Sequence, residues 1–349
     1  MKSILITGGA GFVGSHAVLE FLTNNYKIHV LDSFINSSIK SLDRIKSIIN
    51  NDLKFNNLIV HKGDLRDKVL IQNIFRNAIK LDEPIKGVIH LAGLKSVKQS
   101  ILKTCKYWDI NVAGTINLIQ IMEEFNCFNL VFSSSATVYG FTENKPFKED
   151  SILNPINPYG MTKMVVEKLL SDIFINSNHS WRIANLRYFN PIGAHTSGKI
   201  GESSKTAPEN IFPLIVNSAI DQKKELILFG NDWPTRDGTP IRDFIHVMDV
   251  AQAHYKSYEY LLENKSQCIT INIGTGEGTS VLELVKIFES ANKVKIPFRY
   301  SSRRKGDTPY IVADNKFAQK ILGWEPKRNI YQMCKDGWKW KVTNPNGYF

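Results

Sequence analysis

The sequence predicts an α/β fold in which a doubly wound parallel sheet is followed by a smaller α/β domain. Two observations carry this prediction. Short apolar runs alternate with stretches of helical spacing up to residue 190, and turn residues become dense immediately afterwards. Regular alternation of strand and helix produces a parallel sheet that helices cover on both faces. We therefore assign residues 1–190 to the first domain and residues 191–349 to the second.

The individual elements follow from apolar runs, periodicity and turn signals. Strands are predicted where a short apolar run meets a turn signal, at residues 2–7, 27–31, 58–60, 87–91, 129–133 and 181–186. Helices are predicted where apolar residues recur at helical spacing, at residues 12–23, 68–79, 107–125, 161–175, 250–263 and 280–292. Residues 191–208 and 230–238 are predicted loops, and we expect residues 245–263 to pack back onto the first domain.

The composition excludes several classes of protein. A hydrophobic fraction of 43% over 349 residues is typical of a globular chain and excludes a disordered one. The four cysteines are widely spaced, which predicts neither a disulfide framework nor a zinc site, and favours a reduced, cytoplasmic protein. No apolar run is long enough for a membrane helix. The net charge of +11 allows nucleic-acid binding, but the lysines are dispersed, so we rank that function last.

A glycine cluster separates the first predicted strand from the first predicted helix. Gly9, Gly11 and Gly14 fit G-x-G-x-x-G, and Gly8 extends the cluster. Glycine is needed where a tight turn brings the backbone close to a pyrophosphate and the helix close to the strand. Asp32 ends the second strand, where a carboxylate takes the ribose hydroxyls and repels a 2′-phosphate, so NAD is favoured over NADP. The pattern predicts a Rossmann-like NAD-binding domain; a glycine-rich turn with a solvated aspartate is the alternative.

Three further residues point to chemistry at the carboxyl edge of the sheet. Tyr159 and Lys163 are four residues apart, which puts both on one face of a helix. An ammonium near a phenol favours the phenolate, which can accept a proton. Ser135 follows the fifth strand, at the edge where open α/β sheets bind ligands. Taken alone, Tyr159 and Lys163 also fit an exposed Tyr–Lys pair, and Ser135 also fits a helix cap or a turn.

Several segments together resemble the UDP-glucose 4-epimerase family of the extended short-chain dehydrogenases/reductases. They are TGGAGFVG, LAGLKSV, SSSATVYG, NPYGMTK, LRYFNPIGAH, FGNDWPTRDGTPIRDFIHVMD and RRKGD. The resemblance runs from Ile4 to about Trp340, without a large gap. It implies inversion at C4 of UDP-galactose and UDP-glucose through a transient 4-keto sugar, with the hydride stored on tightly bound NAD.

The resemblance also implies roles for individual residues. Tyr159 would be the base, Ser135 would hydrogen-bond the same sugar oxygen, and Lys163 would hold the nicotinamide ribose. The implied cofactor-binding residues are Gly8, Gly11, Phe12, Val13, Gly14, Asp32, Asn36, Asp64, Leu65, Leu91, Lys95, Tyr159, Lys163 and Tyr188. The implied UDP-sugar-binding residues, most of them in the second domain, are Lys95, Ser135, Tyr159, Asn190, Asn210, Phe229, Arg242, Arg304, Asp307 and Ile311. A homodimer through the helices near residues 107–125 and 159–175 is implied, and no metal.

Two departures bear on the activity. Ser135-Ala136-Thr137 stands where related sugar dehydratases have Thr-Asp-Glu, so the acid pair that eliminates water is missing. Ile311 occupies a position that in this family controls room for an N-acetyl group, and its size is intermediate. A 4-epimerase acting mainly on UDP-N-acetylglucosamine or UDP-glucuronate is therefore one alternative. A catalytically inactive NAD-binding regulator is another, from a different functional class.

Overall fold

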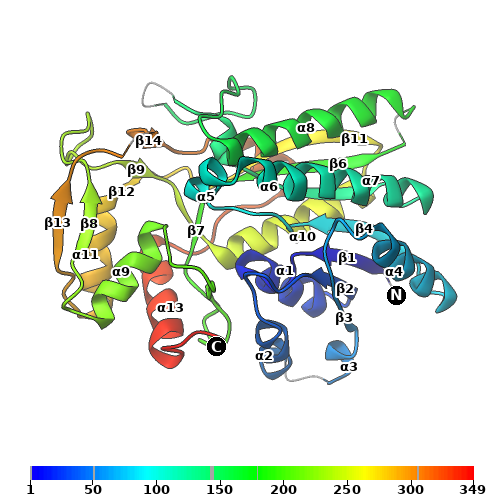
Figure 1. Cartoon of the computed structure of the whole chain (residues 1–349), viewed down its shortest axis with the longest axis horizontal. Coiled ribbons are helices and arrows are strands. Elements are labelled where there is room, and N and C mark those ends of the chain that lie inside the picture. The colour runs from blue at the N-terminus through cyan, green and yellow to red at the C-terminus, as the bar shows by residue number, and fades with distance from the viewer. Residues whose placement is uncertain (1, 50–51, 142–144, 179, 305) are drawn as a thin grey trace.

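The computed structural model describes residues 2–49, 52–141, 145–178, 180–304 and 306–349. Within these residues, seven parallel strands form the main sheet, which occupies the right half of Figure 1. In spatial order the strands are β11 (Gln267–Ile273), β6 (Arg182–Tyr188), β5 (Asn129–Ser135), β4 (Ile85–His90), β1 (Ser3–Thr7), β2 (Lys27–Asp32) and β3 (Leu58–Lys62). The predicted doubly wound, Rossmann-like sheet is confirmed.

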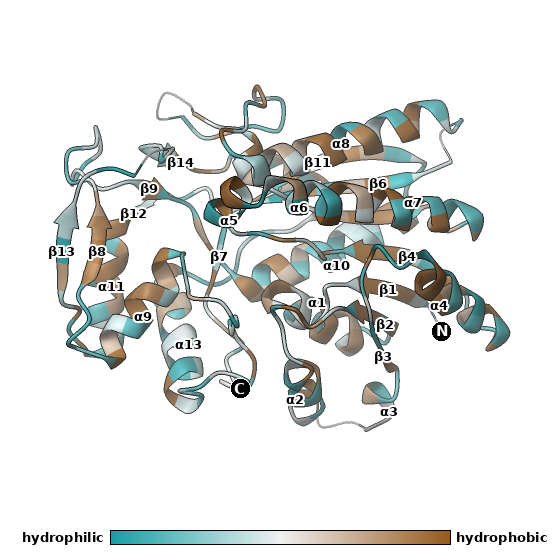
Figure 2. Ribbon diagram, viewed as in Figure 1, coloured by the Kyte–Doolittle hydropathy of each residue, from teal (hydrophilic) through white to brown (hydrophobic). Residues whose placement is uncertain are grey.

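Helices cover both faces of this sheet because successive strand residues point to opposite sides. In β1, Ile4 and Ile6 join one core cluster, and Leu5 joins the other. The first cluster is formed with α1 (Phe12–Thr23), α2 (Lys40–Ile49), α10 (Val247–Glu263) and α12 (Lys316–Leu322). The second is formed with α4 (Lys68–Lys80), α7 (Gly114–Glu124) and α8 (Pro158–Asn176). The hydrophobic colouring of β1 and β4 in Figure 2 follows from this two-sided burial.

The chain after residue 190 forms small sheets with their own helices, on the left of Figure 1. The strands are β7 (Asn190–Ile192) with β10 (Phe244–His246), β12 (Thr279–Ser280) with β9 (Ile241–Arg242) and β14 (Tyr310–Ile311), and β13 (Phe298–Ser301) with β8 (Leu226–Phe229). The helices α9 (Ile211–Ile220), α11 (Val281–Asn292) and α13 (Ile330–Thr343) bury a third core cluster with them. The domain boundary at residue 190 stays a prediction.

The structure corrects several predicted elements. β11 was not predicted, although the glycines at 274, 276 and 278 follow its apolar run as a turn signal, and it forms one edge of the main sheet. The predicted helix at 107–125 is divided into α6 (Thr104–Trp108), a π-helical turn (Asp109–Ala113) and α7. α8 begins at Pro158 rather than at residue 161, because Asn157 accepts a hydrogen bond from the Gly160 N–H at 2.9 Å.

The remaining short elements complete the described chain. They are α3 (Asp52–Phe55), α5 (Val97–Leu102) and a 3₁₀ turn (Ala136–Val138). Among the helices that the structure describes, none combines the length and the apolar composition needed to cross a membrane.

Parallel strands place all their carboxyl ends at one edge of the sheet. The strand order reverses direction between β1 and β4, since β2 and β3 follow β1 on one side while β4, β5 and β6 follow on the other. In open α/β sheets, ligands bind in the crevice at such a reversal. The edge that carries the ends of β1, β2, β4, β5 and β6 is therefore where a site is expected.

Two buried tyrosines give a matched test of this core. The Tyr258 hydroxyl is buried in α10 and has no hydrogen-bond partner among the described residues. The buried Tyr139 hydroxyl donates to Asn272 at 2.6 Å and accepts from Arg187 at 2.9 Å. An unsatisfied buried hydroxyl costs stability, so Tyr258→Phe should stabilise the fold by about 1 kcal/mol and raise Tm by roughly 2 °C.

Tyr139→Phe removes the same atom from a satisfied position and should lower Tm instead, because it leaves Arg187 and Asn272 without a partner. Thermal unfolding of both variants, followed by circular dichroism, tests this. Equal shifts in Tm for the two variants would contradict the assignment of the Tyr258 hydroxyl as unsatisfied.

Candidate active site

The glycine loop forms a cradle that side chains would fill. A Cβ on Gly14 would lie 2.1 Å from the Gly8 carbonyl oxygen. Gly8 itself has φ +70°, and a Cβ on it would lie 2.7 Å from the Ala92 nitrogen. α1 begins after Gly11, and within the described chain no side chain caps it there. The first N–H groups of α1 thus face the crevice, where they favour an anion such as a pyrophosphate.

Asp32 is buried at the end of β2, and its hydrogen bonds connect the glycine loop to the loop that follows β2. One carboxylate oxygen accepts from the Ala10 N–H at 2.9 Å. The other accepts from the Phe34 N–H at 2.9 Å and from the Ser37 hydroxyl at 2.8 Å. Carboxylate oxygens have further lone pairs, so Asp32 can also accept from ribose hydroxyls. Phe12 and Val13, also predicted for the cofactor, are half-buried in the first turn of α1 beside this loop.

A segment of the second half of the chain, residues 202–206, is hydrogen-bonded to the loop that follows β2. We call this segment the strap, and the loop after β2 the cofactor loop. Asn36 accepts hydrogen bonds from the Ser204 hydroxyl at 2.7 Å and from the Lys205 N–H at 3.0 Å. The Lys205 ammonium donates to the Phe34 carbonyl at 2.7 Å. At its other end, the strap residue Glu202 pairs with Lys95 at 2.9 Å. Two residues predicted to bind the cofactor, Asn36 and Lys95, therefore also hold the strap.

The other predicted cofactor residues follow the strands at the same edge. Asp64 and the buried Leu65 come directly after β3, and the Asp64 carboxylate accepts from Arg66, whose hydrogen bonds lower the pKa of that carboxyl. Leu91 follows β4, and its N–H donates to the Thr7 carbonyl at 3.1 Å. Tyr188 ends β6, directly opposite Ser135 in the β5–β6 register.

Three consecutive serines end β5, and each contacts a different group. The Ser133 carbonyl accepts from the Lys163 ammonium at 2.7 Å, while the Ser133 hydroxyl bonds His254 at 2.9 Å. The Ser134 hydroxyl donates to the Glu167 carboxylate. The Ser135 hydroxyl accepts from the Thr137 hydroxyl at 3.0 Å and faces Tyr159.

Tyr159 and Lys163 lie on the buried face of α8, with exposed fractions of 7% and 6%. Burial raises the pKa of Tyr159 above its usual range, the nearby Tyr188 adds to this, and the hydrogen bond with Ser135 opposes it. Burial lowers the pKa of Lys163 to about 8, against the opposing charge of Glu167. In the chain by itself, burial therefore favours the neutral form of both side chains.

A second group of predicted residues gathers on the small sheets. Arg304 lies over the Phe229 ring, with its Cζ 4.8 Å from the ring centroid, and pairs with Asp307 at 3.0 Å. Arg242 donates to the Thr308 carbonyl at 2.9 Å, and burial lowers its pKa to about 10. The neighbouring charges of Asp307 and Arg304 act on that pKa in opposite directions, so the three side chains form one charged cluster.

The remaining predicted substrate residues border this cluster. Ile311 pairs with Arg242 in the β14–β9 register and packs against a buried cluster that includes Phe189 and Ala136. The Asn190 N–H donates to the Asp243 carbonyl at 3.0 Å. Asn210 precedes α9 but does not cap it with its side chain, and is exposed. Lys305, in the RRKGD segment, lies outside the described residues.

Sequence reasoning missed the strap and the polar groups behind the serines. Glu167 pairs with Arg187 at 2.6 Å, and both side chains are buried. His254 reaches Ser133 from α10 with a pKa that burial lowers to about 4, so it is neutral. Only Glu167 gave a local signal, because a carboxylate four residues after Lys163 shares the apolar face of its helix.

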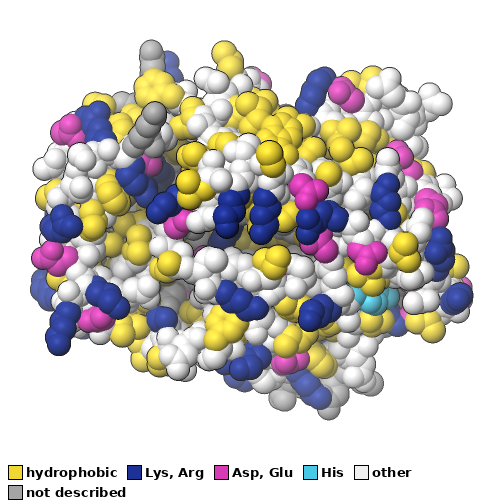
Figure 3. Space-filling model, in the orientation of Figure 1, with side chains coloured by type: hydrophobic (Ala, Val, Ile, Leu, Met, Phe, Trp, Pro, Cys, Tyr) yellow, Lys and Arg dark blue, Asp and Glu magenta, His cyan; other side chains and the backbone are white. Residues whose placement is uncertain are grey.

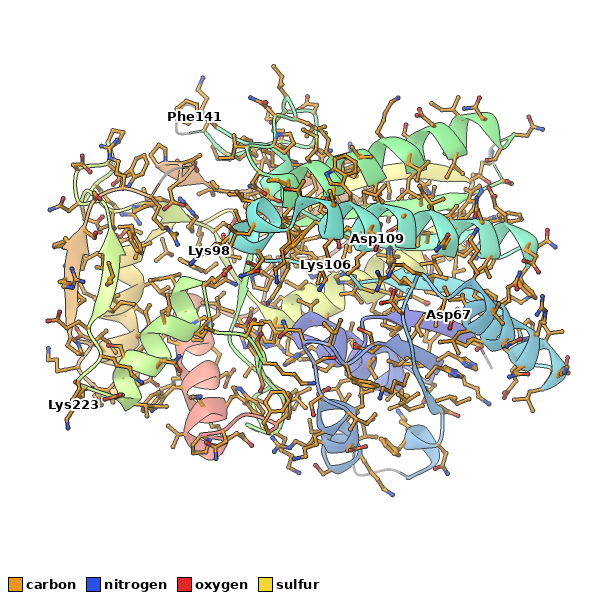
Figure 4. The ribbon with its side chains drawn as sticks, in the orientation of Figure 1. Asp67, Lys98, Lys106, Asp109, Phe141 and Lys223 are labelled. Atoms are coloured by element: carbon orange, nitrogen blue, oxygen red, sulfur yellow. The ribbon has the colours of Figure 1, made fainter. Side chains whose placement is uncertain are left out.

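Basic side chains are prominent on the face drawn in Figure 3. In the same orientation, Figure 4 places Lys98 on α5 and Lys106 on α6, near the middle of the molecule. A field of this sign attracts anionic ligands.

Comparison with known proteins relates this arrangement to a group of enzymes. A family model described as GDP-mannose 4,6 dehydratase matches residues 5–337. The UDP-glucose 4-epimerase of Bacillus subtilis (strain 168) is 44% identical over 346 residues, which is 99% of this chain and 98% of that protein.

Solved structures agree with this likeness. UDP-glucose-4-epimerase from Stenotrophomonas maltophila, with bound NAD and formylated UDP-arabinopyranose, has a TM-score of 0.92 at 39% identity and covers 98% of both chains. The UDP-glucose 4-epimerase from Bifidobacterium longum, in complex with NAD+ and UDP, has a TM-score of 0.91 at 37% identity and covers 99% of this chain and 100% of that one.

The strap generates a prediction about cofactor retention. Asn36→Ala removes the acceptor of the Ser204 and Lys205 N–H hydrogen bonds and loosens the strap, while the bond from the Lys205 ammonium to the Phe34 carbonyl remains at this loop. Losing about 1 kcal/mol of hydrogen bonding should speed the release of bound dinucleotide by about fivefold. The measurement is the nucleotide left in the purified protein during timed dialysis. Asn24→Ala, which removes only a local helix-end bond to Glu20, is the control and should retain nucleotide normally. Equal retention in both variants would contradict this role of the strap.

Proposed function

The chain belongs to the UDP-glucose 4-epimerase family of the extended short-chain dehydrogenases/reductases, and on this premise we propose that it interconverts UDP-galactose and UDP-glucose. The reaction inverts C4 through a transient 4-keto sugar. The observation that carries the proposal is the buried group of Tyr159, Lys163 and Ser135 at the carboxyl edge of the sheet. NAD is the cofactor, and it fits the glycine cradle, the uncapped start of α1 and Asp32.

The family model that matches the chain is described as a dehydratase, so the distinction needs a physical reason. Elimination of water requires an acid and a base beside the leaving group. At the end of β5 this chain has Ser135, Ala136 and Thr137, and Thr137 has no ionisable proton to give. These residues support epimerisation rather than dehydration.

In the proposed mechanism, the substrate's 4-hydroxyl lies between Tyr159 and Ser135. NAD, when bound, supplies the hydride acceptor and returns the hydride to the opposite face of the sugar. Tyr159 accepts the hydroxyl proton, and Ser135 hydrogen-bonds the same oxygen. Lys163 holds the cofactor ribose from the other side of Tyr159. Tyr188, opposite Ser135 in the strand register, is proposed to contact the cofactor.

Positive charge decides the protonation state of Tyr159. Burial raises its pKa, so the phenol does not ionise near neutral pH unless cations stabilise the phenolate. The Lys163 ammonium, 6.0 Å from the Tyr159 ring centroid, is one such cation, and the nicotinamide ring adds another. Lys163 therefore has to stay charged, although burial lowers its pKa to about 8. We expect activity to fall on the alkaline side as this ammonium loses its proton.

UDP binds at the charged cluster on the small sheets. Arg242 and Arg304 offer guanidinium groups that suit a diphosphate, and Phe229 offers a ring face for the base. In the chain alone Arg304 pairs with Asp307, and the diphosphate replaces part of that pairing. A firm hold on UDP leaves the sugar free to turn over between the two hydride transfers.

Three further proposals complete the assignment. Residues 1–190 hold NAD and residues 191–349 hold the UDP-sugar. The chain forms a homodimer through the helices near residues 107–125 and 159–175, where exposed apolar residues support an interface: Trp108 at the end of α6, Ile116 on α7 and Ile175 on α8. The cytoplasm is the proposed compartment, since the cysteines of the chain are all unpaired.

Substitution of the catalytic residues tests the activity. Tyr159→Phe and Lys163→Met should each lower kcat for UDP-galactose by at least about a hundredfold, because each removes a positioned acid–base group or the cation that activates it. The assay separates UDP-glucose from UDP-galactose by chromatography, without added cofactor. Lys168→Met, on the exposed face of the same helix, is the control and should retain activity. Normal turnover by Tyr159→Phe would overturn the assignment, and an inactive wild-type chain with bound NAD would favour a regulator.

Ile311 tests the choice of sugar. It lies beside Arg242 and against Phe189, where a larger side chain would take space from the sugar. Ile311→Tyr should lower any activity on UDP-N-acetylglucosamine by at least about tenfold and change that on UDP-galactose little, since the acetyl group needs the extra room. Rates with the two sugars, compared in the same preparation, decide this. An equal loss on both would show that Ile311 does not select the N-acetyl group.

A further inference from the structure

A buried ion pair lies directly behind the catalytic residues. Glu167 is four residues after Lys163 and eight after Tyr159, on the same face of α8. Arg187, from β6, donates to both Glu167 oxygens, at 3.0 Å from Nε and 2.6 Å from Nη2. The Ser134 hydroxyl, from β5, donates to the same carboxylate. Glu167 thus joins α8 to the two strands that carry Ser135 and Tyr188.

The network continues beyond Arg187 and leaves its polar groups satisfied. Arg187 also donates to the Tyr139 hydroxyl and to the Glu149 carbonyl, both at 2.9 Å. The Tyr139 hydroxyl donates to Asn272 of β11 at 2.6 Å. Such a pair adds little net stability over an apolar pair of the same shape, because both charges lose their hydration. Because the Glu167–Arg187 pair lies beside Tyr159 and Lys163, it can affect catalysis rather than stability.

We propose that Glu167 is a positioning residue for the reaction, and this rests on the proposed function. Its carboxylate, held by Arg187 and Ser134, fixes the register of α8 against β5 and balances a second buried cation next to Lys163. The same register sets the 2.7 Å bond from Lys163 to the Ser133 carbonyl and the approach of Tyr159 to Ser135. Near-attack geometry is sensitive to displacements of about 1 Å, so a small shift of α8 lowers the rate.

The groups around the Lys163 ammonium make Glu167 its nearest negative charge among the described residues. Facing it are Tyr159 and Glu167 of α8, the Phe132 ring and Ser133 carbonyl of β5, and His90 of β4. His90 is neutral, because burial lowers its pKa to about 3. Glu167 raises the pKa of Lys163 against the effect of burial. Without this carboxylate, the charge of Arg187 is left unbalanced and the ammonium loses its proton at lower pH.

Two variants of the holoenzyme test the proposal. Glu167→Gln should lower kcat for UDP-galactose by at least about tenfold, with KM changed by less than about twofold, because the UDP-binding cluster is on other sheets. The alkaline limb of its kcat–pH profile should move down by about one pH unit. Ser134→Ala, which keeps both charges and removes only the strand contact, should lower kcat about threefold with its alkaline limb in place.

The control is Asp172→Asn, which neutralises an exposed carboxylate on the same helix and should match the wild type in rate and profile. Bound NAD and Tm are measured for each protein, so that rates are compared between folded holoenzymes. Wild-type kcat and an unmoved alkaline limb in folded Glu167→Gln would overturn the proposal. If that variant does not fold, wild-type kcat in Ser134→Ala overturns it. An inactive wild-type chain would instead defeat the proposed function, and the two failures are thereby distinguished.

Discussion

The contact between α8 and β5 is the constraint on which the candidate site depends. Lys163 bonds the Ser133 carbonyl, and Glu167 bonds the Ser134 hydroxyl one helical turn further on. Two bonds a turn apart leave α8 neither free to rotate nor free to slide along the strand. The phenol of Tyr159, one turn before Lys163, is thereby brought within hydrogen-bonding reach of Ser135. A helix N-terminus fixed by Asn157 and Pro158 completes this placement.

Burial disfavours the charged forms of Tyr159 and Lys163 that the proposed mechanism requires. It raises the pKa of Tyr159 and lowers that of Lys163, whereas the proposed mechanism needs a phenolate beside an ammonium. A more exposed site would remove this conflict but would admit water to a reactive keto sugar. The chain resolves the conflict by adding charge inside the buried site, from Glu167 behind Lys163 and from the cofactor in front of Tyr159. In the chain alone, burial keeps the Tyr159 phenol neutral and leaves the Lys163 ammonium close to losing its proton.

The features that the sequence predicted correctly are those that depend on residues close together in the chain. The glycine cradle and the Tyr159–Lys163 spacing are local patterns, so both could be found, and the doubly wound sheet is confirmed. β11 also had a local signal, an apolar run closed by the glycines at 274, 276 and 278, and was missed. The strap could not be found, because it is defined by its hydrogen bonds to Asn36, far along the chain. The Arg187–Glu167 pair could be found only in part: Glu167 has the helical spacing from Lys163, but its partner Arg187 lies on β6 and is identified only by the fold. The assigned roles of the site residues stay predictions.

The chain after residue 190 contributes residues to two parts of the candidate site, the strap over the loop after β2 and the charged cluster on the small sheets. The strap is hydrogen-bonded to Asn36 in the loop after β2, which is proposed to bind the cofactor, and Arg242 and Arg304 belong to the charged cluster proposed to bind UDP. Between them, Asp243 accepts from the N–H groups of Gly276 and Ala313, which joins the strand bearing Arg242 to the segments around it. In a reaction that returns its hydride in every cycle, the cofactor never has to leave, so a strap that slows exchange does not slow turnover.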